Sequence, residues 1–135
     1  MEKQINEKII EIVHQANDMI PVEWDDLYIV IEIDKTYSGG AYFFFKYKDQ
    51  YHYHLEMSED FGISMMEVLN ENKVLFKKSE ELKKVFVEND LADWYICIIH
   101  LDEDNKLSVD FDYAPWLESN FGPIARESIM ANSYN

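Results

Sequence analysis

The sequence predicts an α+β protein with a mostly antiparallel, five-stranded sheet and helices packed on one face of the sheet. Apolar residues recur every three or four positions in two long segments and alternate with other residues in several short ones. Short turn sequences join most of the alternating segments, which favours antiparallel neighbours because parallel strands need long crossovers. The predicted order is helix, three strands, helix, two strands, helix, within a single domain of residues 1–135.

The first half of the chain reads as a helix followed by a meander. Apolar residues between Ile5 and Ile20 follow the helical period, and a proline at position 21 ends the helix. Three strands are then predicted over residues 27–34, 41–48 and 51–56, of which the second is strongly aromatic. Ser38-Gly39-Gly40 is predicted to form a flexible turn between the first two, and Asp49-Gln50 a tight turn between the last two.

The second half reads as a long helix, a hairpin and a final helical segment. Ser64 and Glu67 have the spacing of a capping box, which predicts that the long helix begins here, and it should end near residues 89–90. Strands are predicted over residues 94–102 and 106–113, joined by a short acidic turn. Pro115 opens a last segment that is predicted to be one helix interrupted around Gly122-Pro123.

The chain is strongly acidic, with 27 Asp and Glu against 12 Lys and Arg, a net charge of −15 and a pI near 4.4. Such a charge repels nucleic acid and anionic membranes and attracts basic partners, although many acidic proteins are acidic only for solubility. No apolar run reaches membrane-spanning length, and residues 1–8 do not resemble a signal peptide, so we expect a cytoplasmic protein. The single cysteine, Cys97, lies in an apolar run and is predicted to be a core thiol.

An enzymatic function has two candidate sites in the sequence. His52, His54 and Glu56 would share one face of the third strand and could ligate a metal for hydrolysis together with nearby carboxylates. Separately, Asp110 and Asp112 share a face of the last strand, where clustered carboxylates could hold metals for phosphodiester hydrolysis, although an exposed acidic patch is the alternative. The alternative is that the histidines are outward polar residues whose neighbours point inward. The sequence has no third ligand fixed by a motif, no glycine-rich phosphate loop and no nucleophile elbow. We therefore predict no catalytic, cofactor or metal site.

Another hypothesis, besides an enzyme, is a non-catalytic oligomeric module. Tyr28, Tyr42 and Phe44 alternate with the apolar set on their strands and would form a second aromatic surface. Such a surface could mediate self-association, or a helix could cover it. Light scattering would distinguish a monomer from a dimer.

Nearly the whole chain resembles the YezG-like family of bacterial immunity proteins and antitoxins. The similarity lies in four stretches: Ala16-Asn-Asp-Met-Ile-Pro-Val-Glu-Trp24, Gly40-Ala-Tyr-Phe-Phe-Phe45, the helix end from Leu82 to Leu91, and Val109-Asp-Phe-Asp-Tyr-Ala-Pro-Trp116 continuing into Asn120-Phe-Gly122. The first and last are the most distinctive, because neither helix nor strand patterning dictates them. Residues 124–135 differ from the aromatic, basic segment that often follows in the family.

The resemblance implies an antitoxin that neutralises a cognate toxin of a type VII secretion system before export. The toxins that such family members neutralise include nucleases. It implies no catalytic residues. An acidic surface is physically suited to a nuclease, whose phosphate-binding surface is basic. The residues predicted to contact this partner are six acids and one aromatic anchor: Glu32, Asp34, Asp102, Asp104, Asp110, Asp112 and Trp116. The alternatives are a solvated acidic face for the acids, and core packing for Trp24 and Trp116.

Overall fold

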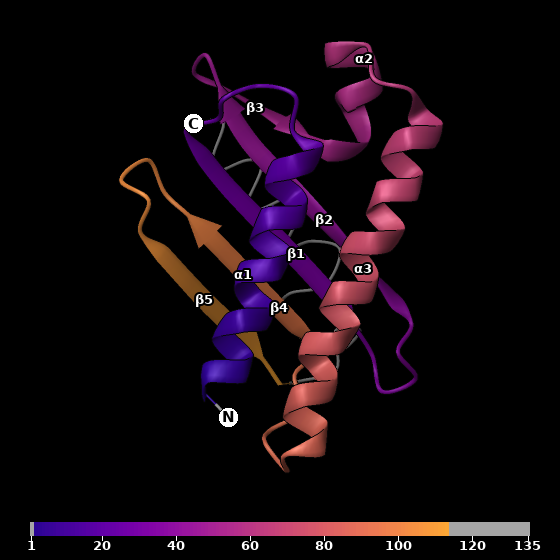
Figure 1. Ribbon diagram of the computed structural model, residues 1–135, viewed down its shortest axis with the longest axis vertical. Coiled ribbons are helices and arrows are strands. Elements are labelled where there is room, and N and C mark those ends of the chain that lie inside the picture. The colour runs from indigo at the N-terminus through magenta and orange to yellow at the C-terminus, as the bar shows by residue number, and fades with distance from the viewer. Residues whose placement is uncertain (1, 114–135) are drawn as a thin grey trace.

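The computed structural model describes residues 2–113 and confirms the predicted α+β architecture (Figure 1). In chain order the elements are α1 (Glu2–Met19), β1 (Asp26–Ile33), β2 (Gly39–Tyr47), β3 (Gln50–Tyr53), the 3-10 turn η1 (His54–Glu56), α2 (Met57–Phe61), α3 (Met65–Glu88), β4 (Ile96–Leu101) and β5 (Leu107–Asp112). The short helix α2 was not predicted. The final predicted helical segment lies outside the described residues.

The five strands form one sheet with the order β3-β2-β1-β4-β5, and every neighbouring pair is antiparallel. Strand β1 lies at the centre, where Leu27 is opposite Phe45 of β2 on one side and Leu101 of β4 on the other. Helix α3 is the connection that carries the chain from the β3 edge back to β4 beside β1.

Helices α1 and α3 pack against each other and cover one face of the sheet (Figure 1). The strand residues that face them form the core together with the apolar sides of both helices. On β1, for example, Leu27, Ile29, Ile31 and Ile33 are each at most 1 % exposed. The alternation that predicted this strand therefore also identified its inner face.

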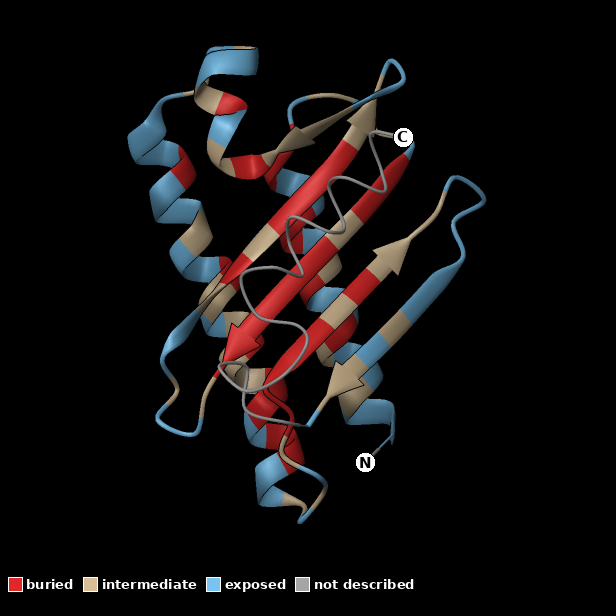
Figure 2. Ribbon diagram, turned by 180° about the vertical axis from the view of Figure 1, so that it is seen from behind, coloured by how far each residue is buried: buried red, intermediate tan, exposed pale blue. Residues whose placement is uncertain are grey.

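The opposite face of the sheet is also largely buried at its centre. Seen from that side, the central strands are buried over most of their length, whereas β5 is mainly exposed or half-buried (Figure 2). Val30 is fully buried and Phe44 is 1 % exposed, with the Phe44 ring stacked 5.1 Å from that of Tyr53. Of the two alternatives left open for these aromatics, Phe44 is therefore buried and not part of an exposed surface, while Tyr28 and Tyr42 are half-buried.

Two turns differ from their predicted form. Lys48 and Asp49, with φ of 51° and 63°, form the two-residue loop of the β2–β3 hairpin, since Tyr47 pairs with Gln50. Gly39 belongs to β2 and not to a flexible turn. It has φ of 152°, and a Cβ atom at this position would lie 1.7 Å from the carbonyl oxygen of Glu32, so only glycine fits.

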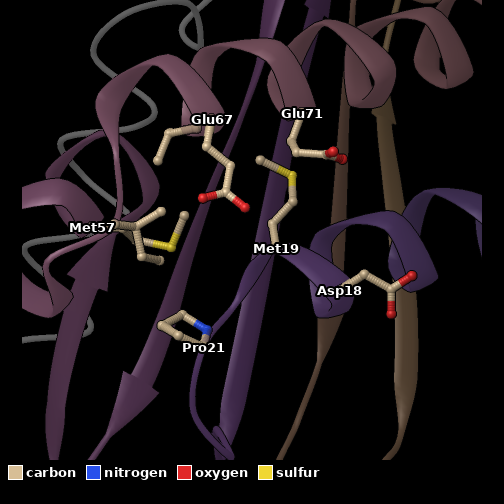
Figure 3. A pocket seen from close by; sticks show the side chains of 8 residues that line it. Asp18, Met19, Pro21, Met57, Glu67 and Glu71 are labelled. Atoms are coloured by element: carbon tan, nitrogen blue, oxygen red, sulfur yellow. The ribbon is translucent and has the colours of Figure 1, made fainter.

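The capping box predicted at the start of α3 is not formed. Ser64 is the N-cap residue, as expected, but its side chain makes no capping hydrogen bond. Glu67 instead points toward a pocket between α1 and α3 (Figure 3). The sequence pattern thus located the helix start correctly and assigned the wrong role to its glutamate.

Candidate functional site

One edge of the sheet, formed by β4, β5 and their turn, carries an excess of acidic side chains. Helix α3 carries five Glu and five Lys, so the net charge of −15 arises entirely from the rest of the chain. Residues 96–113, which contain β4, β5 and their turn, carry five acidic side chains and one lysine, Lys106. We call the acids of this hairpin the β4–β5 acidic surface; they are Asp102, Glu103, Asp104, Asp110 and Asp112.

Two of these acids project from the edge strand itself. Asp110 and Asp112 alternate around Phe111 and therefore lie on the same face of β5, opposite Ile98 and Ile96 of β4. Together these residues line a groove of about 280 Å³. Asp110 is exposed and Asp112 half-buried, so the groove combines an apolar floor with carboxylates that a partner can reach.

The predicted contact acids do not form a single patch. Glu32 shares a row with Ile96 and Asp112 across three strands, yet it is only 3 % exposed and does not lie on the accessible surface. Asp34 follows β1, whereas Asp102 and Asp104 lie in the β4–β5 turn at the opposite end of the sheet (Figure 1). Trp116 lies outside the described residues.

Asp34 and Asp102 have a structural role in their own turns. The Oδ1 atom of Asp34 accepts hydrogen bonds from the backbone N of Thr36 at 2.8 Å and of Ser38 at 3.0 Å, and from the Thr36 hydroxyl at 2.6 Å. These hydrogen bonds lower the pKa of Asp34, and the one from the Thr36 hydroxyl has the largest effect. Asp102 Oδ1 likewise accepts from the backbone N of Asp104 and of Lys106, each at 2.9 Å. Both carboxylates therefore shape a turn.

The predicted pairing of His52 and His54 on one outward face is wrong. Strand β3 ends at Tyr53, and His54 begins the η1 turn. His52 faces the helical layer, with its ring 5.0 Å from that of Phe61 and its Nδ1 2.9 Å from Asp60 Oδ2. Tyr51 and Tyr53 occupy the other face. Within residues 2–113, no group of three or more His, Cys, Asp or Glu side chains is arranged to hold a metal ion.

His54 is a core residue. It is 0 % exposed, and its Nδ1 accepts a hydrogen bond from the backbone N of Phe43 at 3.1 Å. The two rings are stacked at a centroid separation of 4.7 Å. Burial lowers the pKa of His54 to about 4, against smaller upward effects from the hydrogen bonds with Phe43 and Asn72. The imidazole is therefore neutral at physiological pH.

Cys97 is the core thiol that the sequence predicted. It is fully buried on the inner face of β4, and burial raises the pKa of its thiol. A buried, protonated thiol is a poor nucleophile. Trp24 is also partly packed against the core, and its Nε1 donates a hydrogen bond to Asn17 Oδ1 at 2.9 Å.

The sequence analysis missed one polar cluster, on the face of the sheet away from the helices. Asp26 is 6 % exposed and accepts a hydrogen bond from the Tyr51 hydroxyl at 2.6 Å, while His100 Nε2 lies 2.7 Å from its other oxygen. The His100 ring stacks on Tyr28 with centroids 3.9 Å apart. These residues lie on three strands, up to 74 positions apart, so only the strand order could have connected them.

A comparison with known protein families decides the relationship of this chain. The family described as "Immunity protein YezG-like" matches residues 4–134. This chain belongs to the YezG-like immunity protein family. The resemblance inferred from the four sequence stretches is thereby confirmed.

Two curated relatives of this YezG-like chain cover most of its length. It is 32 % identical over 131 residues to the type VII secretion system protein EsaG of Staphylococcus aureus, covering 94 % of this chain and 78 % of the relative. It is 27 % identical over 121 residues to the immunity protein YezG of Bacillus spizizenii, covering 87 % and 74 %. In the part of the chain that is described, no helix is both long and apolar enough to cross a membrane.

Proposed function

We propose that this YezG-like protein is a cytoplasmic, non-catalytic antitoxin that binds and neutralises a secreted nuclease toxin through its β4–β5 acidic surface. Its membership of an immunity protein family supports a toxin as the partner. Similarity to a protein named for the type VII secretion system supports a toxin exported by that route.

The observation on which the proposed surface rests is the charge of the edge hairpin. Five acidic side chains and a single lysine lie within 18 consecutive residues, and Asp104 and Asp110 are both exposed. A nuclease binds phosphate with a basic surface, which this hairpin would attract and occupy. Trp116, which lies outside the described residues, is retained as a proposed aromatic anchor for the partner.

The antitoxin role is tested by mixing the purified protein with the toxin encoded beside its gene. We expect a stable complex in size-exclusion chromatography and loss of cleavage of plasmid DNA at an equimolar ratio. Unchanged cleavage in the presence of excess protein, with no complex, would refute the antitoxin role. A complex with a toxin that never cleaves nucleic acid would refute only the nuclease assignment.

The acidic surface is tested by neutralising two exposed acids. The variant Asp104→Asn/Asp110→Asn should bind about tenfold more weakly at low salt, mainly through slower association, and the difference should shrink at 0.5 M NaCl as screening increases. The matched control, Glu2→Gln/Glu7→Gln, removes the same charge from exposed positions on α1. Equal affinities for the two variants across all salt concentrations would show that binding does not use this surface.

A further inference from the structure

A second surface lies on the other layer of the molecule, where the end of α1 meets the start of α3. A cavity of about 390 Å³ opens between these helices, with α2 and the proline that follows α1 closing its sides (Figure 3). Its lining residues come from four segments of the chain: Asp18, Met19, Pro21, Met57, Ile63, Glu67, Val68 and Glu71. We call this cavity the α1–α3 pocket.

The α1–α3 pocket has an apolar floor and an acidic rim. Met19, Met57 and Val68 are 8 %, 1 % and 2 % exposed and form the floor. The carboxylates of Asp18, Glu67 and Glu71 belong to exposed residues, and Glu67 points toward the space between Met57 and Met19 (Figure 3).

The position of one rim carboxylate is fixed by the buried side chain of Gln15. Gln15 Nε2 donates to Glu71 Oε2 at 2.8 Å and to the Glu71 carbonyl oxygen at 3.2 Å. No Lys or Arg lines the pocket, and within residues 2–113 no ion pair neutralises any of the three rim acids. The lysines of α3 begin at Lys73, six residues after Glu67 and two after Glu71.

This combination limits what the pocket can bind. An anion would be repelled by the three carboxylates, and a neutral apolar group would bring those carboxylates next to apolar surface at a cost in solvation. A bare metal ion would gain nothing from the apolar floor, and the rim acids do not form a metal-binding group. Lysine and arginine side chains combine an apolar stem with a cationic head, so they match both the floor and the rim.

We propose that the α1–α3 pocket receives a lysine or arginine side chain of the partner protein, whose stem packs on Met19, Met57 and Val68 and whose charge pairs with Glu67 and Glu71. This inference rests on the proposed function, because it requires a protein partner. It adds a contact on the helical layer, separate from the β4–β5 acidic surface at the edge of the sheet.

The pocket can be tested without the toxin. The probe is N-acetyl-arginine N-methylamide, titrated into 15N-labelled protein, with the uncharged citrulline analogue as the control ligand. We expect saturable chemical-shift changes at millimolar concentration in the amides of residues 18–19, 57–63 and 67–71. The changes should be absent with the citrulline analogue and in the variant Glu67→Gln/Glu71→Gln. Equal changes with citrulline, or changes spread over the whole acidic surface, would overturn the proposal.

The toxin complex provides the second test. Glu67→Gln/Glu71→Gln should weaken toxin binding by about 30-fold, the loss typical of removing one partner from an enclosed charge pair. The control Glu2→Gln/Glu7→Gln changes the net charge equally and should keep wild-type affinity. Wild-type affinity of the pocket variant, with a weakened Asp104→Asn/Asp110→Asn variant, would refute the pocket and leave the antitoxin role intact. If no toxin complex forms at all, the proposed function fails, and with it the pocket's assignment to a protein partner.

Discussion

Replacing the buried histidine should make the protein less sensitive to acid. His54 is neutral in the folded protein, and burial lowers its pKa from 6.5 to about 4. In the unfolded chain it titrates near 6.5, so below this pH the unfolded state binds a proton that the folded state rejects. The stabilisation is therefore complete above pH 6.5 and is lost progressively as the pH falls toward 4.

The magnitude follows from the difference between the two pKa values. The full difference corresponds to about 3 kcal/mol, of which about 2 kcal/mol should be lost between pH 7.5 and pH 5.0. Replacing His54 with Asn keeps a side-chain acceptor for the backbone N of Phe43 and removes the titrating group. We expect a variant that is less stable at pH 7.5, because it leaves a cavity, but whose free energy of unfolding falls by about 2 kcal/mol less than that of the wild type.

The assay is urea denaturation followed by tryptophan fluorescence at both pH values. Carboxylates contribute the same background to both proteins, so the difference between their pH dependences isolates His54. His14→Asn is the control, because His14 is exposed on α1 and its replacement should leave the pH dependence unchanged. If His54→Asn and the wild type lost the same stability between pH 7.5 and 5.0, the argument from burial would be refuted.

Three further predictions concern the core and its boundaries. Gly39→Ala should lower the free energy of unfolding by about 3 kcal/mol or more, because the added Cβ would collide with the backbone of β1. Gly62→Ala, at φ of 71° with no atoms nearby, should lower it by only about 1 kcal/mol. Thermal melts of the two variants compare these losses, and equal losses would contradict the collision at Gly39. Lys83→Met should lower the free energy of unfolding by about 1–3 kcal/mol in urea denaturation, because the buried ammonium donates to the Trp94 carbonyl and lies 2.6 Å from an Asp93 carboxylate oxygen. The control Lys77→Met replaces an exposed lysine of the same helix and should leave the stability unchanged. A Lys83 variant as stable as the wild type would show that the buried pair contributes nothing. Cys97 should react with a thiol reagent only at the rate of unfolding, and rapid modification under native conditions would contradict its burial.

The sequence predicted the central strands well because their pattern has one interpretation. In β1, Leu27, Ile29, Ile31 and Ile33 alternate with a tyrosine, a valine and a glutamate, so the four share one face, and a shift of one residue would turn them away from the helices. The third strand had no such contrast, since tyrosine and histidine are both amphipathic and alternate in Tyr51-His52-Tyr53-His54. The contact of Phe61 with His52 determines which face is inner, and this contact depends on the unpredicted helix α2.

The candidate site was harder to predict than the fold because it depends on strand order and on local hydrogen bonds. Counting acids identified the acidic hairpin, but could not show that Glu32 is buried in the sheet. The turn role of Asp34 was in principle readable, since an Asp followed by Thr36 and Ser38 is typical of such turns. The α1–α3 pocket joins residues more than 50 positions apart, and no spacing within one element could indicate it.

The central position of β1 has a consequence for how the protein is made. Its second neighbour, β4, is encoded far downstream, since Leu27 pairs with Leu101. At about 5–20 residues per second, a ribosome needs roughly 4–15 s to pass from one strand to the other, and during this time one side of β1 lacks its final neighbour. A newly started chain is therefore not yet able to protect the cell, and a bacterium that makes a toxin and this protein together would benefit from translating this protein first.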